Sequence, residues 1–278
     1  MPETGIDGLR LDRVRGFVFD VDGTLVHRTA DGRAHPQPGA LEVLDRIRAS
    51  GRPLVLFTNG SHVPSEWIAR GLTEDGIPIA DHEMLTPVDS SISYLLRYHR
   101  DRPVLLFGSE AVASRIVESG LTLASGDEAG VVLVTHVDEV SMTKLEQGAR
   151  AVERGAPLLT GSYARGYAGA NGMIFSRGAM VTAAISKVTG ARPKVVGKPS
   201  RIAVAEVSRR LGVPSKDIAV IGDDLGMDIA LGHLGGSRTV LVRSGISGAI
   251  DLARVPERRR PDAVIGAVAE LLGPLSDG

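Results

Sequence analysis

Two aspartates stand two residues apart where an apolar run near the N-terminus ends. Phe17-Val18-Phe19 leads into Asp20-Val21-Asp22-Gly23-Thr24-Leu25, so both carboxylates come where a buried strand should run out, and Gly23 lets the chain turn. Ligands of open α/β sheets bind in the crevice beyond the carboxyl ends of the strands. Burying acids at such a place costs free energy, so their presence indicates that they bind a cation or transfer a proton. This pair therefore predicts chemistry.

The two carboxylates can divide the hydrolysis of a phosphate ester between them. A carboxylate is a competent nucleophile toward phosphorus and splits hydrolysis into two easier steps through an acyl phosphate, which is the task we expect of Asp20. A neighbouring acid can manage the proton, which is the task we expect of Asp22. A hard dication such as Mg²⁺, held by carboxylate oxygens, would offset the negative charge of protein and substrate. The alternative is a turn in which both aspartates only accept backbone hydrogen bonds.

Three further segments end in residues that suit the same chemistry. Thr58-Asn59-Gly60-Ser61 follows an apolar run and offers a hydroxyl for phosphoryl oxygens, although a helix cap and turn explains it equally simply. Lys198 follows another apolar run and could neutralise nucleophile and phosphate together, although a surface lysine is the commoner explanation. Asp223, Asp224 and Asp228 lie within six residues after a third run, enough to complete a metal site with oxygen ligands.

The pattern of the whole chain predicts the scaffold that positions these residues. Short apolar runs alternate with amphipathic stretches, which is typical of a parallel sheet covered by helices on both faces, a Rossmann-like α/β core. We expect core strands at residues 17–19, 54–57, 194–196, 218–221 and 239–242, and helices at 39–49, 65–73, 202–211 and after 227.

More than a hundred residues separate the second and third of these strands and carry signals of their own. Residues 104–107 and 131–134 are expected as strands and 141–153 as a helix. We interpret this insertion as an α/β cap domain at residues 99–190. The catalytic core would then comprise residues 1–98 and 191–278.

Composition excludes several classes of function. The 278 residues carry a formal net charge of −1, which argues against a nucleic-acid or membrane-surface partner. No stretch reaches the ~18 apolar residues of a membrane span, and the N-terminus is too polar for a signal peptide, so we expect a cytoplasmic protein. The chain has no cysteine, which excludes disulfides and thiolate chemistry.

In this order and with these spacings, the four motif segments resemble the haloacid dehalogenase superfamily of phosphotransferases over nearly the whole chain. The resemblance implies that Asp20 is the nucleophile and Asp22 the general acid/base. It implies that Thr58 binds phosphate and Lys198 stabilises charge. It further implies that Asp223 binds Mg²⁺ together with Asp20 and the backbone carbonyl of Asp22. The second acid of this last motif, Asp228, would orient the lysine or a metal-bound water.

The position of the cap and the segment Gly197-Lys198-Pro199-Ser200 are similar to the nitrophenylphosphatase-like branch, which includes phosphoglycolate, glycerol-phosphate, pyridoxal-phosphate and nucleotide phosphatases. The chain departs from that branch at Gly60, where a second asparagine is common, and at Gly161-Ser162-Tyr163-Ala164, where many members carry Thr-Asn-x-Asp. The following Arg165 indicates either an altered substrate preference or a surface loop without ligand contact. We expect substrate contacts from Gly23, Thr58, Asn59, Gly60, Arg165 and Lys198.

These observations favour a Mg²⁺-dependent phosphatase that acts on a small phosphorylated metabolite of the sugar phosphate, phosphoglycolate or glycerol phosphate type, through an aspartyl-phosphate intermediate. A phosphotransferase or phosphomutase on the same fold stays open, as does a non-catalytic binding module. A dehalogenase would not need Asp22, and phosphonate hydrolysis would need a supported cap lysine, which neither Lys144 nor Lys187 is. The resemblance also makes a homodimer through the cap one option, because relatives often dimerise there.

Overall fold

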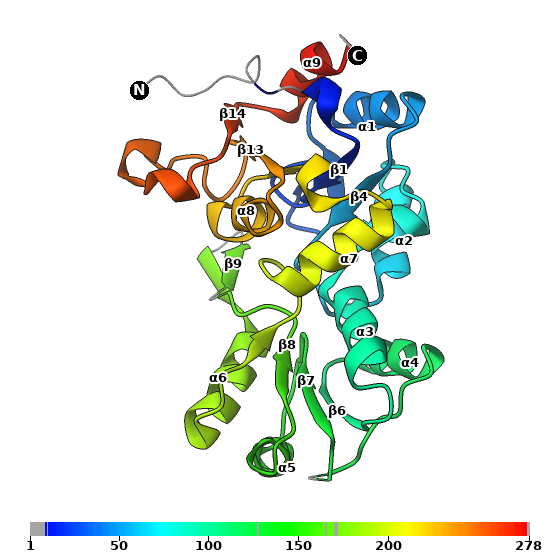
Figure 1. Cartoon of the computed structure of the whole chain (residues 1–278), viewed down its shortest axis with the longest axis vertical. Coiled ribbons are helices and arrows are strands. Elements are labelled where there is room, and N and C mark those ends of the chain that lie inside the picture. Colours follow the sequence, from blue (N-terminus) through cyan, green and yellow to red (C-terminus); the bar gives the residue numbers. More distant parts are fainter. Residues whose placement is uncertain (1–8, 10, 127, 165, 170–171, 277–278) are drawn as a thin grey trace. The chain divides into compact units, whose positions relative to one another are not determined.

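The structure is a computed structural model and describes residue 9 and residues 11–276, apart from 127, 165 and 170–171 (Figure 1). The chain forms two compact units. The first, called here the core, comprises Met1–Thr58, Ile68–Leu85 and Pro199–Gly278, and the second, called here the cap, comprises Asn59–Trp67 and Thr86–Lys198. The cap of the structure thus includes residues 59–67, 86–98 and 191–198, which were expected in the core.

The core is built on a six-stranded parallel sheet with the strand order β14-β13-β12-β1-β4-β5. The strand β1 lies inside the sheet, between β12 and β4, so Phe19 at the end of β1 pairs with Ile221 of β12, although the two residues are far apart in sequence. The strands are β1 (Gly16–Phe19), β4 (Leu54–Phe57), β5 (Met84–Leu85), β12 (Ile218–Gly222), β13 (Arg238–Val242) and β14 (Ala263–Ile265). A separate hairpin, β2 (Val26–Arg28) with β3 (Ala34–Pro36), follows β1.

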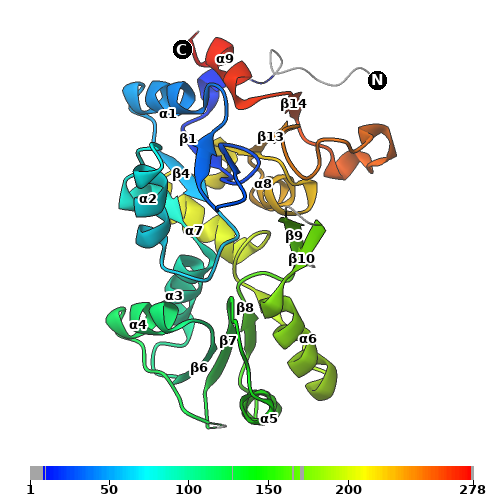
Figure 2. The ribbon, with the colours of Figure 1, turned by 180° about the vertical axis from the view of Figure 1, so that it is seen from behind.

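Both faces of the core sheet are buried because helices cover each of them, and successive side chains of a strand point to opposite faces. In β1, Phe17 and Phe19 pack with α1 (Ala40–Ala49), whereas Val18 packs with α7 (Arg201–Leu211) on the other face. The helix α7 lies in front of the sheet in Figure 1 and behind it in Figure 2. The remaining helices of this unit are α8 (Ala230–Gly235), α9 (Leu272–Ser276) and most of α2 (Ser65–Glu74).

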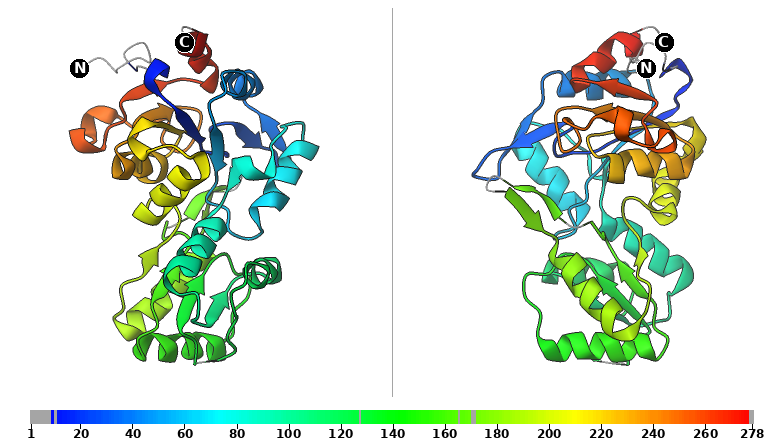
Figure 3. Two further views of the ribbon diagram at one scale, coloured as in Figure 1. Left: turned by 45° about the vertical axis from the view of Figure 1, so that its right-hand side comes forward. Right: turned by 90° about the vertical axis from the view of Figure 1, so that its left-hand side faces the viewer.

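The cap contains its own four-stranded parallel sheet with the order β11-β8-β7-β6. Apolar side chains from α5 (Met142–Glu153) and α6 (Arg177–Thr189) cover one face of this sheet, and Figure 3 shows these helices in green beside the strands. The elements of the cap are α3 (Pro87–Tyr98), β6 (Val104–Phe107), α4 (Glu110–Glu118), β7 (Val131–Val134), α5 (Met142–Glu153), β8 (Leu158–Thr160), β9 (Gly166–Gly169), β10 (Gly172–Phe175), α6 (Arg177–Thr189) and β11 (Lys194–Val195).

The expected fold class, a mixed α/β protein with parallel sheets, is confirmed. One expected core strand was placed in the wrong sheet. Residues 194–195 form β11, which pairs with β8 of the cap and not with the core strands. A two-residue strand carries too little pattern to reveal its partner. Among the described residues, no helix has both the length and the apolar character needed to cross a membrane.

Candidate active site

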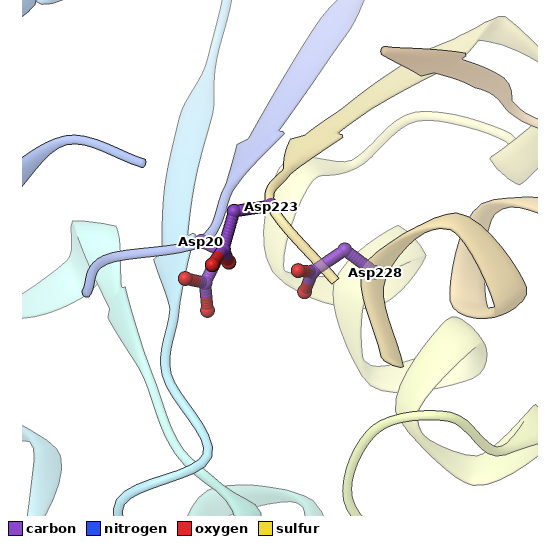
Figure 4. Close-up of side chains that lie close together, drawn as sticks. All are labelled: Asp20, Asp223 and Asp228. Atoms are coloured by element: carbon purple, nitrogen blue, oxygen red, sulfur yellow. The ribbon is translucent and has the colours of Figure 1, made fainter. Parts of the chain in front are cut away.

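Three carboxylates lie together at the carboxyl ends of two neighbouring core strands. Asp20 follows β1, Asp223 follows β12, and Asp228 lies in the π-helical turn Leu225–Ile229 that comes next. Each offers a ligand oxygen, and these oxygens lie within 4.8 Å of one another. All three side chains are buried, and Figure 4 shows them pointing toward a common region.

Backbone pairing brings the first two acids side by side. The strands β1 and β12 are parallel with Phe19 opposite Ile221, and the N–H of Asp20 donates to the Ile221 carbonyl over 2.8 Å. The ladder therefore continues one residue beyond β1. Since parallel strands end at the same edge of a sheet, residues that follow the two strands meet there.

The loop after β13 holds Asp223 in place. The Ile246 N–H donates to Oδ2 of Asp223 over 2.7 Å, and the Ser247 N–H donates to its carbonyl over 3.0 Å. Gly245 lies against the same carboxylate so closely that a Cβ there would be 1.8 Å from Oδ2. This loop was not predicted from the sequence, although Ser244-Gly245, which follows the apolar strand after one residue, was a signal that could have found it.

A backbone amide likewise holds Asp228. The Asp224 N–H donates to Oδ2 of Asp228 over 3.1 Å, and the Asp224 side chain accepts a hydrogen bond from the Gly226 N–H over 2.6 Å. Asp224 therefore caps the π-helical turn. This capping agrees with leaving Asp224 out of the predicted catalytic set.

Asp22 lies apart from this carboxylate cluster. Its side chain is half-exposed, and Oδ1 accepts a hydrogen bond of 2.6 Å from Nε of Arg28 on the β2–β3 hairpin. The turn between Asp22 and this hairpin depends on Gly23, whose φ of 88° is a left-handed conformation that suits glycine. The N–H of Gly23 donates to Val26 over 2.8 Å, and Ser244 Oγ donates to the Gly23 carbonyl over 2.6 Å.

The other predicted site residues are distributed over both units. Thr58 is the last residue of the first core segment. It follows β4, is buried, and its N–H donates to the Leu85 carbonyl over 3.2 Å. Asn59, Gly60 and the buried Lys198 belong to the cap, so their approach to Asp20 stays a prediction. The predicted substrate contact Arg165 lies outside the described residues.

The donor set of the cluster fits Mg²⁺, which prefers carboxylate and other oxygen ligands. Two ionised carboxylates at separations up to 4.8 Å repel each other by roughly 3 kcal/mol or more at an effective dielectric constant of about 20. A divalent cation among three such groups would reverse the sign of these interactions. The residues that would hold it are Asp20, Asp223 and Asp228, with the carbonyl of Asp22 predicted as a further ligand.

Comparison with known proteins shows the family to which the chain belongs. A family model described as haloacid dehalogenase-like hydrolase matches residues 17–122, and a second model of the same kind matches residues 195–271. The chain belongs to the haloacid dehalogenase-like hydrolases, in the branch that resembles nitrophenylphosphatases and NagD.

The relatives within this class are phosphatases. The chain is 26% identical over 261 residues to the ribonucleotide monophosphatase NagD of Escherichia coli, covering 93% of this chain and 98% of NagD. It is 24% identical over 263 residues to an acid sugar phosphatase of Staphylococcus aureus, and the match covers 94% of this chain and 99% of that phosphatase. The solved structure of the p-nitrophenyl phosphatase from Archaeoglobus fulgidus has 25% sequence identity and a TM-score of 0.83, and the match covers 94% of this chain and 98% of that one. The prediction of a phosphomonoester hydrolase is confirmed at the level of class.

Proposed function

We propose that the protein is a Mg²⁺-dependent phosphatase that hydrolyses a small phosphorylated metabolite through a phosphorylated Asp20. The observation that carries this proposal is the group of three buried carboxylates at the ends of β1 and β12. Burying three acids this close together is unfavourable unless the site handles a cation and a charged substrate. The phosphatase relatives support the same conclusion.

In the first step, a carboxylate oxygen of Asp20 attacks phosphorus. The bond from phosphorus to the ester oxygen breaks, its electron pair goes to that oxygen, and the oxygen takes a proton from Asp22. The alcohol leaves, and Asp20 carries the phosphoryl group. Bound Mg²⁺ would neutralise charge on the phosphoryl oxygens and on the acids during this step.

In the second step, water attacks phosphorus and gives a proton to Asp22. The bond between phosphorus and the Asp20 oxygen breaks, which returns the Asp20 carboxylate and releases inorganic phosphate. Asp22 thus gives up one proton in the first step and regains one in the second. Thr58 would donate a hydrogen bond to a phosphoryl oxygen, and Lys198 would add positive charge at the nucleophile.

We propose a sugar phosphate, nucleotide or similar phosphorylated metabolite as the substrate class. The proposal rests on the names of the relatives, which include a ribonucleotide monophosphatase and an acid sugar phosphatase. The cap would select among them. A panel of sugar phosphates, phosphoglycolate, glycerol phosphate, pyridoxal phosphate and nucleotides, assayed for phosphate release, tests this proposal.

We also propose that two copies associate through the cap. The side chains of Met142 on α5 and of Met180 and Val188 on α6 are apolar and exposed, which supports an interface there. Light scattering after size exclusion would give the mass of a dimer, and a monomer at micromolar concentration would refute this proposal. A cytoplasmic location stays a prediction from the sequence.

Turnover of p-nitrophenyl phosphate with and without Mg²⁺ tests the proposed chemistry. We expect the wild type to be active only with the metal and Asp20→Asn to be inactive, because an amide is a poor nucleophile toward phosphorus. Activity that survives Asp20→Asn would refute the covalent route. An inactive wild type with Mg²⁺ present would instead favour a binding module.

A further inference from the structure

The hairpin after the Asp20–Asp22 segment carries an arginine that contacts the expected acid/base. Nε of Arg28 donates to Oδ1 of Asp22 over 2.6 Å. Among the described residues, no hydrogen bond reaches the second carboxylate oxygen of Asp22. One oxygen is therefore held, and the other is available for a proton transfer.

The guanidinium of Arg28 is itself held by the tip of the hairpin. Its Nη1 donates to the Gly32 carbonyl over 3.2 Å, and Gly32 has a left-handed φ of 84° at the turn. The N–H of Gly32 donates to the Thr29 carbonyl over 2.9 Å, which closes this turn. The Gly32 carbonyl, which this turn holds in place, thus fixes the direction in which Arg28 reaches Asp22.

The hairpin is in turn fastened to the core at its far strand. Nε of Arg33 donates to Oδ1 of Asp75 over 3.0 Å, and the Ala34 N–H donates to Oδ2 of the same carboxylate over 2.7 Å. Asp75 follows directly on α2. A supported contact of this kind limits how far an acid can move from its working orientation.

We propose that Arg28 is a positioning residue that orients Asp22 for proton transfer to the leaving oxygen. The proposal rests on the proposed phosphatase mechanism and adds a role for a residue outside the four motif segments. The arginine touches neither the nucleophile nor the transferred phosphoryl group in this role. It acts by keeping Oδ1 of Asp22 engaged, so that Oδ2 delivers the proton.

A purely stabilising role for this ion pair is the weaker explanation. The side chains of Arg28 and Asp22 are 42% and 49% exposed. Ion pairs at such exposure contribute little to stability because water and salt screen them. Loss of the pair should therefore leave unfolding almost unchanged, and its effect should appear in the chemistry.

The test uses substituted phenyl phosphates whose leaving groups differ in basicity but not in overall shape. A good leaving group such as p-nitrophenolate departs without a proton, whereas phenolate gains from a general acid. The quantity kcat/KM reports the first irreversible step, which is departure of the phenol. Its dependence on leaving-group basicity therefore measures proton delivery by Asp22.

We expect Arg28→Ala to lower kcat/KM for phenyl phosphate about tenfold and for p-nitrophenyl phosphate at most about twofold. Arg28→Lys should recover part of the loss, because it retains a cationic donor. In the Asp22→Asn background, Arg28→Ala should add no further dependence on the leaving group. Arg254→Ala is the matched control, because it removes an exposed arginine that pairs with another aspartate, Asp251, outside the hairpin, and it should not change that dependence.

Equal losses on both substrates in Arg28→Ala would overturn the proposal, and so would an equal effect of Arg254→Ala on the leaving-group dependence. Thermal unfolding of every variant shows that the fold is retained. A wild type that hydrolyses neither ester would refute the proposed function instead, so the two failures are distinguishable.

Discussion

The substitution Gly245→Ala tests how closely the loop after β13 is built against the acid cluster. A Cβ at this position would lie 1.8 Å from Oδ2 of Asp223 and 2.5 Å from its Cγ. Ordinary contacts between such atoms are about 3.5–4.0 Å. Either the loop or the carboxylate must therefore move by more than an ångström, and the hydrogen bond from Ile246 to Asp223 would be lost with it.

Two costs add in this variant. Inserting a methyl group into a packed site costs about 1–3 kcal/mol, and losing a hydrogen bond to a charged group costs about 1.5–3 kcal/mol. Because movement of the loop relieves part of the overlap, we expect the free energy of unfolding to fall by about 3 kcal/mol. Displacing Asp223 should also weaken the response to Mg²⁺.

The matched control is Gly71→Ala, the same chemical change in the interior of α2. A Cβ at Gly71 would meet nothing within 4 Å. Alanine is the better helix former, so this variant should gain about 0.5–1 kcal/mol. The two variants are thus expected to shift the free energy of unfolding in opposite directions.

Denaturant unfolding of the metal-free proteins measures both shifts, and melting temperature against Mg²⁺ concentration measures the metal response. At a Mg²⁺ concentration of about 100 times its Kd, binding stabilises a protein by about 2.7 kcal/mol. We expect that stabilisation in the wild type and in Gly71→Ala but only a fraction of it in Gly245→Ala. A Gly245→Ala protein with wild-type stability and metal response would show that the contact with Asp223 is not tight.

Two further predictions concern charged groups. Asp223→Asn keeps an acceptor for Ile246 but removes a carboxylate from the cluster, so we expect Mg²⁺ affinity measured by calorimetry to fall at least about tenfold; equal affinity would contradict its role as a ligand. Burial raises the pKa of Glu83, but hydrogen bonds from Arg48 and the Ala80 N–H outweigh it and leave the pKa below its usual value. The ionised Glu83 carboxylate therefore contributes to the free energy of unfolding above the pKa that Glu83 has in the unfolded chain, and this contribution is lost as the pH falls through its pKa in the folded protein. Glu83→Gln should lower the free energy of unfolding by about 2–3 kcal/mol near neutral pH and by less as the pH falls, which denaturation at several pH values would check.

Long apolar runs between turn residues could be predicted from the sequence. The strands at 54–57, 104–107 and 131–134 have the expected bounds because four consecutive buried residues, flanked by Gly, Pro or polar residues, admit few other structures. The short strands β5 and β14 were missed and β11 was misplaced. Runs of two or three residues are defined by their pairing partners, and those partners lie far away in sequence.

In the candidate site, too, some features could be predicted from the sequence and others could not. Acids that follow strands could be expected to meet, and Asp20, Asp223 and Asp228 do lie together. The contact between Arg28 and Asp22 was not predictable, since it depends on the register of the β2–β3 hairpin and on the turn at its tip. The support of Asp223 by Ile246 depends on a loop backbone whose conformation no side-chain pattern reveals.

The register of the core sheet gives Gly222 a specific task. Continuing the pairing of Phe19 with Ile221 places Gly222 beside Asp20. A Cβ at Gly222 would lie 2.3 Å from Cγ of Asp228, so the carboxyl group of Asp228 occupies the space that a side chain would take there. The missing side chain thus allows an acid from the following turn to approach the nucleophile.

We therefore expect Gly222→Ala to displace Asp228 and to weaken Mg²⁺ binding as much as Asp228→Asn does. Because the two changes would act through the same carboxylate, combining them should lower the Mg²⁺ affinity no further than Asp228→Asn alone. Calorimetric titration of the three variants with Mg²⁺ measures this. Losses that add in the double variant would mean that Gly222 serves the site by another route, through the backbone of β12 and not through the space it leaves for Asp228.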